Sequence, residues 1–117
     1  MSYQPGTHII STLHTSSAEK LVEHAAVKQL LDKLIIHFSL EKLGEVYHNF
    51  PGGGFTATVC LSESHLSIHT WPEYMLVNMD IYLSNYQRNN DGTVEAVFDA
   101  LKTFFEATTS SKQTIRR

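Results

Sequence analysis

The chain has 117 residues, of which 42% are hydrophobic and 18% are charged, and its formal net charge is -3. This length suits one ordinary domain, and this composition is typical of a globular chain and not of a disordered or fibrous one. The nine Lys and Arg residues form no cluster beyond Arg116 and Arg117, which argues against a nucleic-acid partner. We therefore expect a single domain over residues 1–117.

No apolar run approaches the roughly 20 residues that a membrane-spanning helix needs. Met1 is followed by polar residues and by Pro5 and Gly6, which does not fit a secretory signal sequence. We expect a cytoplasmic protein without membrane contact.

The single cysteine, Cys60, stands among Ala57, Val59 and Leu61. One cysteine cannot form an internal disulfide, and its apolar neighbours predict a small buried side chain.

In chain order, the β-branched run from His8 to Leu13 predicts a first strand. Ser16 with Glu19 three residues later fits a capping box, which predicts a helix that begins there and ends before Gly44. Six apolar residues at helical spacing mark the buried face of this helix: Val27, Leu30, Leu31, Leu34, Ile35 and Phe38.

Between Gly44 and Tyr82 the pattern changes to short β-rich runs separated by turn residues. Pro51 to Gly54 marks a turn, and Trp71 with Pro72 interrupts the chain. The predicted strands span residues 45–50, 55–62, 66–70 and 76–82.

After a loop at residues 89–92, a second amphipathic helix is predicted by Val94, Val97, Phe98, Leu101, Phe104 and Phe105. The tail from Thr108 is polar, and we expect it to fray. The fold class that these elements favour is α+β, a two-layer sandwich of a mostly antiparallel sheet with two helices on one face. The uncovered face favours a second copy, and hence a homodimer.

Seven histidines make a metal site the first chemical hypothesis. His65 and His69 lie four residues apart, which is about 13 Å on a strand. Two ligands bonded to one zinc at about 2 Å cannot lie so far apart, so no metal site is predicted.

A serine hydrolase with Ser64 as nucleophile, a histidine and Asp80 is the second hypothesis. Ser64 has no Gly-x-Ser-x-Gly context. The glycines at 52–54 likewise lack the Gly-Lys-Ser/Thr ending of a phosphate-binding loop. Because both motifs are lacking, the sequence supports neither a serine hydrolase nor a phosphate-binding loop.

Residues 62–74, Ser-Glu-Ser-His-Leu-Ser-Ile-His-Thr-Trp-Pro-Glu-Tyr, resemble the processing-site signature of the prokaryotic S-adenosylmethionine decarboxylase proenzymes. Residues 6–10, 48–50 and 80–82 resemble other segments of that family. The resemblance implies a two-layer sandwich that often forms dimers.

The resemblance also implies self-cleavage between Glu63 and Ser64 into chains 1–63 and 64–117. Ser64 would become a pyruvoyl group, so that no external cofactor is required. This group would form a Schiff base with S-adenosylmethionine and accept electrons as carbon dioxide leaves, which supplies the aminopropyl donor for spermidine synthesis.

Individual roles follow from the same resemblance. His69 matches the histidine that removes the Ser64 α-proton, and Thr56 matches a serine whose hydroxyl assists processing. Phe50 matches the aromatic residue that stacks on adenine, although a core position is the alternative for it. Glu73 matches the acid that accepts hydrogen bonds from the ribose.

Ser84 departs from the family, which has a proton-donating cysteine there. This departure leaves two alternatives open. One is a diverged decarboxylase of another amino acid such as arginine or ornithine, and the other is a non-catalytic paralogue that binds a nucleoside or regulates a partner.

Overall fold

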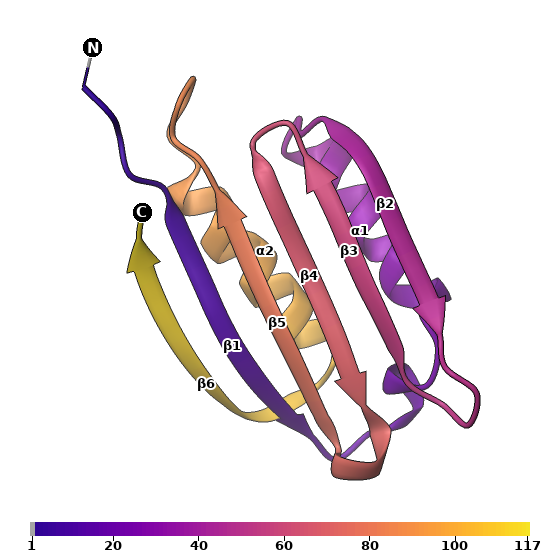
Figure 1. Cartoon of the computed structure of the whole chain (residues 1–117). Coiled ribbons are helices and arrows are strands. Elements are labelled where there is room, and N and C mark those ends of the chain that lie inside the picture. The colour runs from indigo at the N-terminus through magenta and orange to yellow at the C-terminus, as the bar shows by residue number, and fades with distance from the viewer. Residues whose placement is uncertain (1) are drawn as a thin grey trace.

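The structure is a computed structural model that describes residues 2–117. Its six strands form one sheet in the order β2-β3-β4-β5-β1-β6, and all neighbours are antiparallel (Figure 1). The strands are β1 (Thr7–Thr15), β2 (Lys42–Asn49), β3 (Phe55–Leu61), β4 (Ser64–Trp71), β5 (Leu76–Leu83) and β6 (Ala107–Arg116).

Two helices, α1 (Ala25–His37) and α2 (Asp91–Phe104), cover the same face of this sheet (Figure 1). Short 3-10 turns, η1 (Glu19–Leu21) and η2 (Pro72–Tyr74), complete the chain order. The predicted apolar residues of both helices join one core cluster with the inward side chains of the sheet. This arrangement confirms the predicted two-layer α+β sandwich.

Alternation along the strands decides which side chains enter the core. On β3, Phe55, Ala57, Val59 and Leu61 are at most 3% exposed, and the residues between them point away from the helices. Strand pairing aligns these outward residues in rows across the sheet. We call this helix-free side the open face, and its central residues are His8, Ile10, Thr12, Thr56, Thr58, Cys60, His65, Ser67, His69, Asn78, Asp80 and Tyr82.

Three predictions about local structure were wrong. Cys60 is exposed, because β3 alternation places it on the open face. The capping box at Ser16 and Glu19 does not begin a long helix: Glu19 opens η1, and α1 begins only at Ala25.

The tail from Thr108 is not frayed. It forms most of the edge strand β6, which pairs with β1 over nearly its full length. Its side chains are almost all exposed, so no apolar alternation marked it in the sequence.

Within residues 2–117, no helix combines the length and the apolar character needed to cross a membrane.

Candidate active site

β4 begins and β5 ends at the same end of the sheet (Figure 1). Ser64 is the first residue of β4, and Ser84 directly follows the last residue of β5. The backbone N–H of Ser84 donates a hydrogen bond of 2.8 Å to the carbonyl oxygen of Glu63. This donor polarises the carbonyl and is placed to stabilise negative charge on its oxygen during attack.

The backbone of Ser64 has a φ of 123°, a value that side chains disfavour. Such conformations cost about 1 to 3 kcal/mol and persist only where the surrounding structure imposes them. Here the turn at residues 62–63 and the pairing of Ser64 with Leu61 and Leu83 impose it. Strain and polarisation therefore coincide at the Glu63–Ser64 peptide bond.

The side chain of Glu63 is held by two residues of the loop before α2. Arg88 Nε and Nη2 donate to its two carboxylate oxygens at 3.0 and 2.8 Å, and Asn90 Nδ2 donates at 2.6 Å. The Arg88 guanidinium lowers the pKa of Glu63, with a smaller contribution from Asn90, against the opposing effect of burial. Glu63 is thus a fixed anion beside the candidate cleavage site.

A pocket of about 460 Å³ lies toward the other end of the sheet. Its lining includes Phe50, Thr56, His69 and Glu73, and its volume suits a small-molecule site. Thr56 Oγ1 and His69 Nδ1 are hydrogen-bonded at 2.5 Å. Phe50 is 48% exposed, which rules out the alternative of an ordinary core residue.

The predicted site residues therefore form two groups within one chain. Glu63, Ser64 and Ser84 lie at one end, and the pocket residues lie at the other. Ser64 and His69 are five residues apart on β4, which corresponds to about 16 Å along a strand. His69 cannot reach the α-proton of Ser64 in its own chain.

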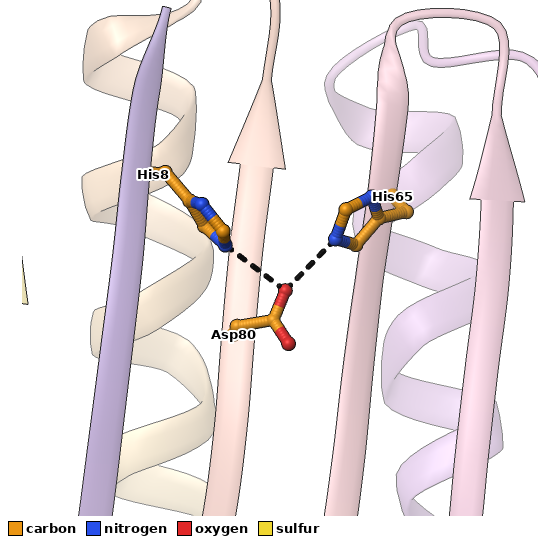
Figure 2. Close-up of side chains that lie close together, drawn as sticks. All are labelled: His8, His65 and Asp80. Carbon is orange, nitrogen blue, oxygen red and sulfur yellow. Dashed lines mark hydrogen bonds and ion pairs between the residues drawn. The ribbon is translucent and has the colours of Figure 1, made fainter. Parts of the chain in front are cut away.

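The open face also carries a cluster of side chains that the sequence did not predict. His8 on β1 and His65 on β4 both direct Nε2 at Oδ1 of Asp80 on β5, at 3.1 and 2.9 Å (Figure 2). Ser67 donates to the other carboxylate oxygen at 2.6 Å. Burial alone would raise the pKa of Asp80, but the hydrogen bonds from Ser67, His8 and His65 hold this pKa below its ordinary value.

Among residues 2–117, this is the one group of His, Cys, Asp or Glu side chains with metal-binding geometry. Metal-bound histidines usually donate their second ring N–H to a partner. His8 Nδ1 is buried without a hydrogen-bond partner in the described chain. Asp80 already accounts for the placement of both histidines, and we keep the prediction that no metal binds.

The sequence offers the loop from Asn85 to Arg88 as a possible source of further site groups but does not place it. The contacts of Arg88 and Asn90 could not be predicted, because tertiary packing sets the path of this polar loop. The His8–Asp80 contact depends on β1 pairing with β5, a long-range register that spacing does not reveal.

Comparison with known proteins identifies the family. The sequence pattern of the S-adenosylmethionine decarboxylase family matches residues 7–117. The "S-adenosylmethionine decarboxylase proenzyme" of Archaeoglobus fulgidus is 38% identical over 86% of this chain and 84% of its own length. That of Picrophilus torridus is 34% identical over 87% of this chain and 78% of its own length.

The crystal structure of the adenosylmethionine decarboxylase from Aquifex aeolicus superimposes with a TM-score of 0.85. It is 28% identical in sequence, and the match covers 99% of this chain and 92% of that one. The chain belongs to the S-adenosylmethionine decarboxylase family.

Proposed function

We propose that this chain is a proenzyme that cuts itself between Glu63 and Ser64 and then decarboxylates S-adenosylmethionine. The observation that carries the proposal is the Glu63–Ser64 bond, whose carbonyl accepts the Ser84 N–H and whose serine has a φ of 123°. A carbonyl that is polarised and a backbone that is strained both favour attack by the neighbouring hydroxyl.

Self-cleavage passes through an ester between Glu63 and Ser64. Ser64 Oγ bonds to the Glu63 carbonyl carbon, the hydroxyl proton passes to the Ser64 nitrogen, and the C–N bond breaks to leave an ester. His69 then removes the Ser64 α-proton while the Cβ–O bond breaks, which frees Glu63 as a carboxylate. The remaining dehydroalanine takes up one water and loses ammonia, so that the 64–117 chain begins with a pyruvoyl group.

These roles require two copies of the chain, because Ser64 and His69 lie about 16 Å apart in one copy. In this dimer the open faces of the two copies pack against each other, and the two-fold axis runs across the strands. Ser64 of one copy then lies beside His69 of the other. The same operation brings the second pair together, since a two-fold contact is reciprocal. We therefore propose a homodimer with two shared active sites.

The pocket supplies the substrate contacts in this proposal. Phe50 offers an exposed aromatic face for adenine, and Glu73 offers a carboxylate for the ribose hydroxyls. A pyruvoyl carbonyl supplies an electrophile for the substrate amine and an electron sink for the departing carbon dioxide. Thr56 holds the His69 ring by the 2.5 Å hydrogen bond to Nδ1.

Intact-mass measurement of purified protein tests the proposal. We expect chains 1–63 and 64–117, the second blocked at its N-terminus, and carbon dioxide released from S-adenosylmethionine. Ser64→Ala should remain whole and inactive. A wild-type protein that stays a single chain after long incubation would remove the basis of the proposal.

A further inference from the structure

Asn90 links the two residues whose backbones meet at the candidate cleavage site. Its side-chain nitrogen donates to Glu63 Oε2 at 2.6 Å and to the carbonyl oxygen of Ser84 at 2.9 Å. An amide nitrogen carries two protons, so both are used. Together with the Ser84 N–H that donates to the Glu63 carbonyl, these contacts form a closed cycle of hydrogen bonds among Glu63, Ser84 and Asn90, next to the bond to be cut.

Asn90 is itself held in place from the other side. The residue is 1% exposed, and its backbone N–H donates to Asn85 Oδ1 at 2.6 Å. Asn85 Nδ2 in turn donates hydrogen bonds to Asp91 Oδ1 and to the Pro5 carbonyl oxygen, both at 3.0 Å. The Asn90 side chain makes no capping hydrogen bond to α2, so both of its donated bonds go to Glu63 and Ser84.

Arg88 connects the Glu63 carboxylate to the C-terminal end of α1. Besides its paired contacts with the Glu63 carboxylate, its Nη2 donates to the carbonyl oxygens of Phe38 and Ser39 at 3.1 Å each. These carbonyls follow the last residue of α1, His37. The Glu63 side chain is thus connected to the end of one helix and to the start of the other.

We propose that Asn90, supported by Arg88, is a positioning residue for self-cleavage. It holds the Glu63 carbonyl oxygen against the Ser84 N–H while Ser64 Oγ attacks. This inference rests on the proposed function. Stabilisation of an oxyanion depends on donor placement, and displacement by about 1 Å can cost about 100-fold in rate.

The test compares self-cleavage rates by intact mass for the wild type, Asn90→Ala, Asn90→Asp and Arg88→Gln. Asn90→Asp keeps the shape of the side chain but has no proton to donate. We expect both Asn90 variants to cleave at least about ten-fold more slowly and Arg88→Gln to be slowed less. Gln87→Ala changes an exposed residue of the same loop and should match the wild type.

Thermal unfolding of each variant shows whether slow cleavage comes from a general loss of structure. Cutting by hydroxylamine shows whether Asn90 acts on the formation of the ester. In a His69→Ala background the ester should persist, and hydroxylamine cuts it to a Glu63 hydroxamate and a chain that begins with Ser64. The rate of this cut reports ester formation alone. Adding Asn90→Asp should slow it by about the factor seen for self-cleavage.

Four outcomes are distinguishable. Slow cleavage and slow hydroxylamine cutting in folded Asn90 variants support the inference. Asn90 variants that cleave within two-fold of the wild type overturn it and leave the proposed function standing. Unchanged hydroxylamine cutting also overturns it, because Asn90 would then act after ester formation. A wild type that never cleaves overturns the proposed function and this inference together.

Discussion

The Ser84 amide donates to the Glu63 carbonyl oxygen at 2.8 Å, so Ser84 contributes to the candidate site through its backbone. The backbone contact survives any substitution that keeps an N–H. The side chain, in contrast, stands where the resemblance to the family implies a proton-donating cysteine. Self-cleavage and turnover should therefore respond differently to changes at Ser84.

Ser84→Cys should raise turnover of S-adenosylmethionine and leave the self-cleavage rate near that of the wild type. A thiol has a pKa near 8.5, whereas an alcohol is a far weaker acid, about as weak as water. Only part of this difference acts in a transition state with a half-moved proton, but that part amounts to orders of magnitude in rate.

The measurement follows carbon dioxide release together with the mass of the 64–117 chain. A poor donor leaves time for misdirected protonation, which would convert the pyruvoyl group to an amine, so the cysteine variant should also survive more turnovers. If the Ser84→Cys variant turns over no faster than the wild type and is inactivated as quickly, Ser84 is not the proton donor.

Phe50→Ala and Glu73→Gln should each weaken S-adenosylmethionine binding or turnover by roughly 1 to 3 kcal/mol, through loss of stacking or of a charged hydrogen bond. Self-cleavage should persist in both. Tyr74→Ala is the matched control, because Tyr74 is 70% exposed and does not line the pocket. Carbon dioxide release from arginine or ornithine, with S-adenosylmethionine ignored, would instead favour a diverged decarboxylase.

Asp91 should stabilise the fold in a defined acidic range. Hydrogen bonds from Thr7, Asn85 and Arg116 lower the pKa of Asp91 from 3.8 to about 2. A lowered carboxyl pKa adds stability above the unfolded value, and this stability is lost as the pH falls from about 4 to about 2. Because the side chain is 37% exposed, solvent screening reduces the contribution to about 1 kcal/mol.

Urea unfolding at several pH values measures this contribution. Both proteins should carry Ser64→Ala, so that the chain stays whole and unfolds as one unit. Asp91→Asn should be less stable by about 1 kcal/mol at pH 6, and the difference should shrink toward zero near pH 2. A difference that is independent of pH would show that the Asp91 charge is not responsible.

Metal removal should have no effect on self-cleavage or on decarboxylation of S-adenosylmethionine. Asp80 already pairs with His8 and His65, and the second ring nitrogen of His8 has no partner within residues 2–117. Protein treated with a chelator should cleave and turn over as before, and zinc should leave the melting temperature unchanged. Stoichiometric zinc that His8→Ala abolishes would contradict this prediction.

Much of the fold was predictable because its core follows regular spacing. The alternation of Phe55, Ala57, Val59 and Leu61 marked β3, and the apolar stripes marked both helical faces. β6 was not predictable in this way, because an exposed edge strand has no buried face to impose a pattern. Cys60 was misjudged because its apolar neighbours along the chain point to the opposite side of the sheet.

Glu63, Ser64, His69 and Glu73 of the candidate site came from the signature at residues 62–74, and Phe50, Thr56 and Ser84 came from the wider resemblance. The arrangement of these residues in space did not follow from the resemblance. The structure shows that Ser64 and His69 both belong to β4, which keeps them apart along one strand. The contact of Asn90 with Glu63 joins residues 27 positions apart in the chain, and no local pattern encodes it. Long-range pairing and loop packing decide such contacts.

The central claim is a self-cleaving active site that two copies share, and co-expression of Ser64→Ala with His69→Ala tests it most directly. Alone, neither variant should form a pyruvoyl chain. In a mixed dimer, Ser64 of the His69→Ala copy meets His69 of the Ser64→Ala copy. Random pairing should therefore process up to about half of the His69→Ala chains, and mass analysis should find no cut Ser64→Ala chain. Mixed dimers that leave both chains whole would contradict the shared site.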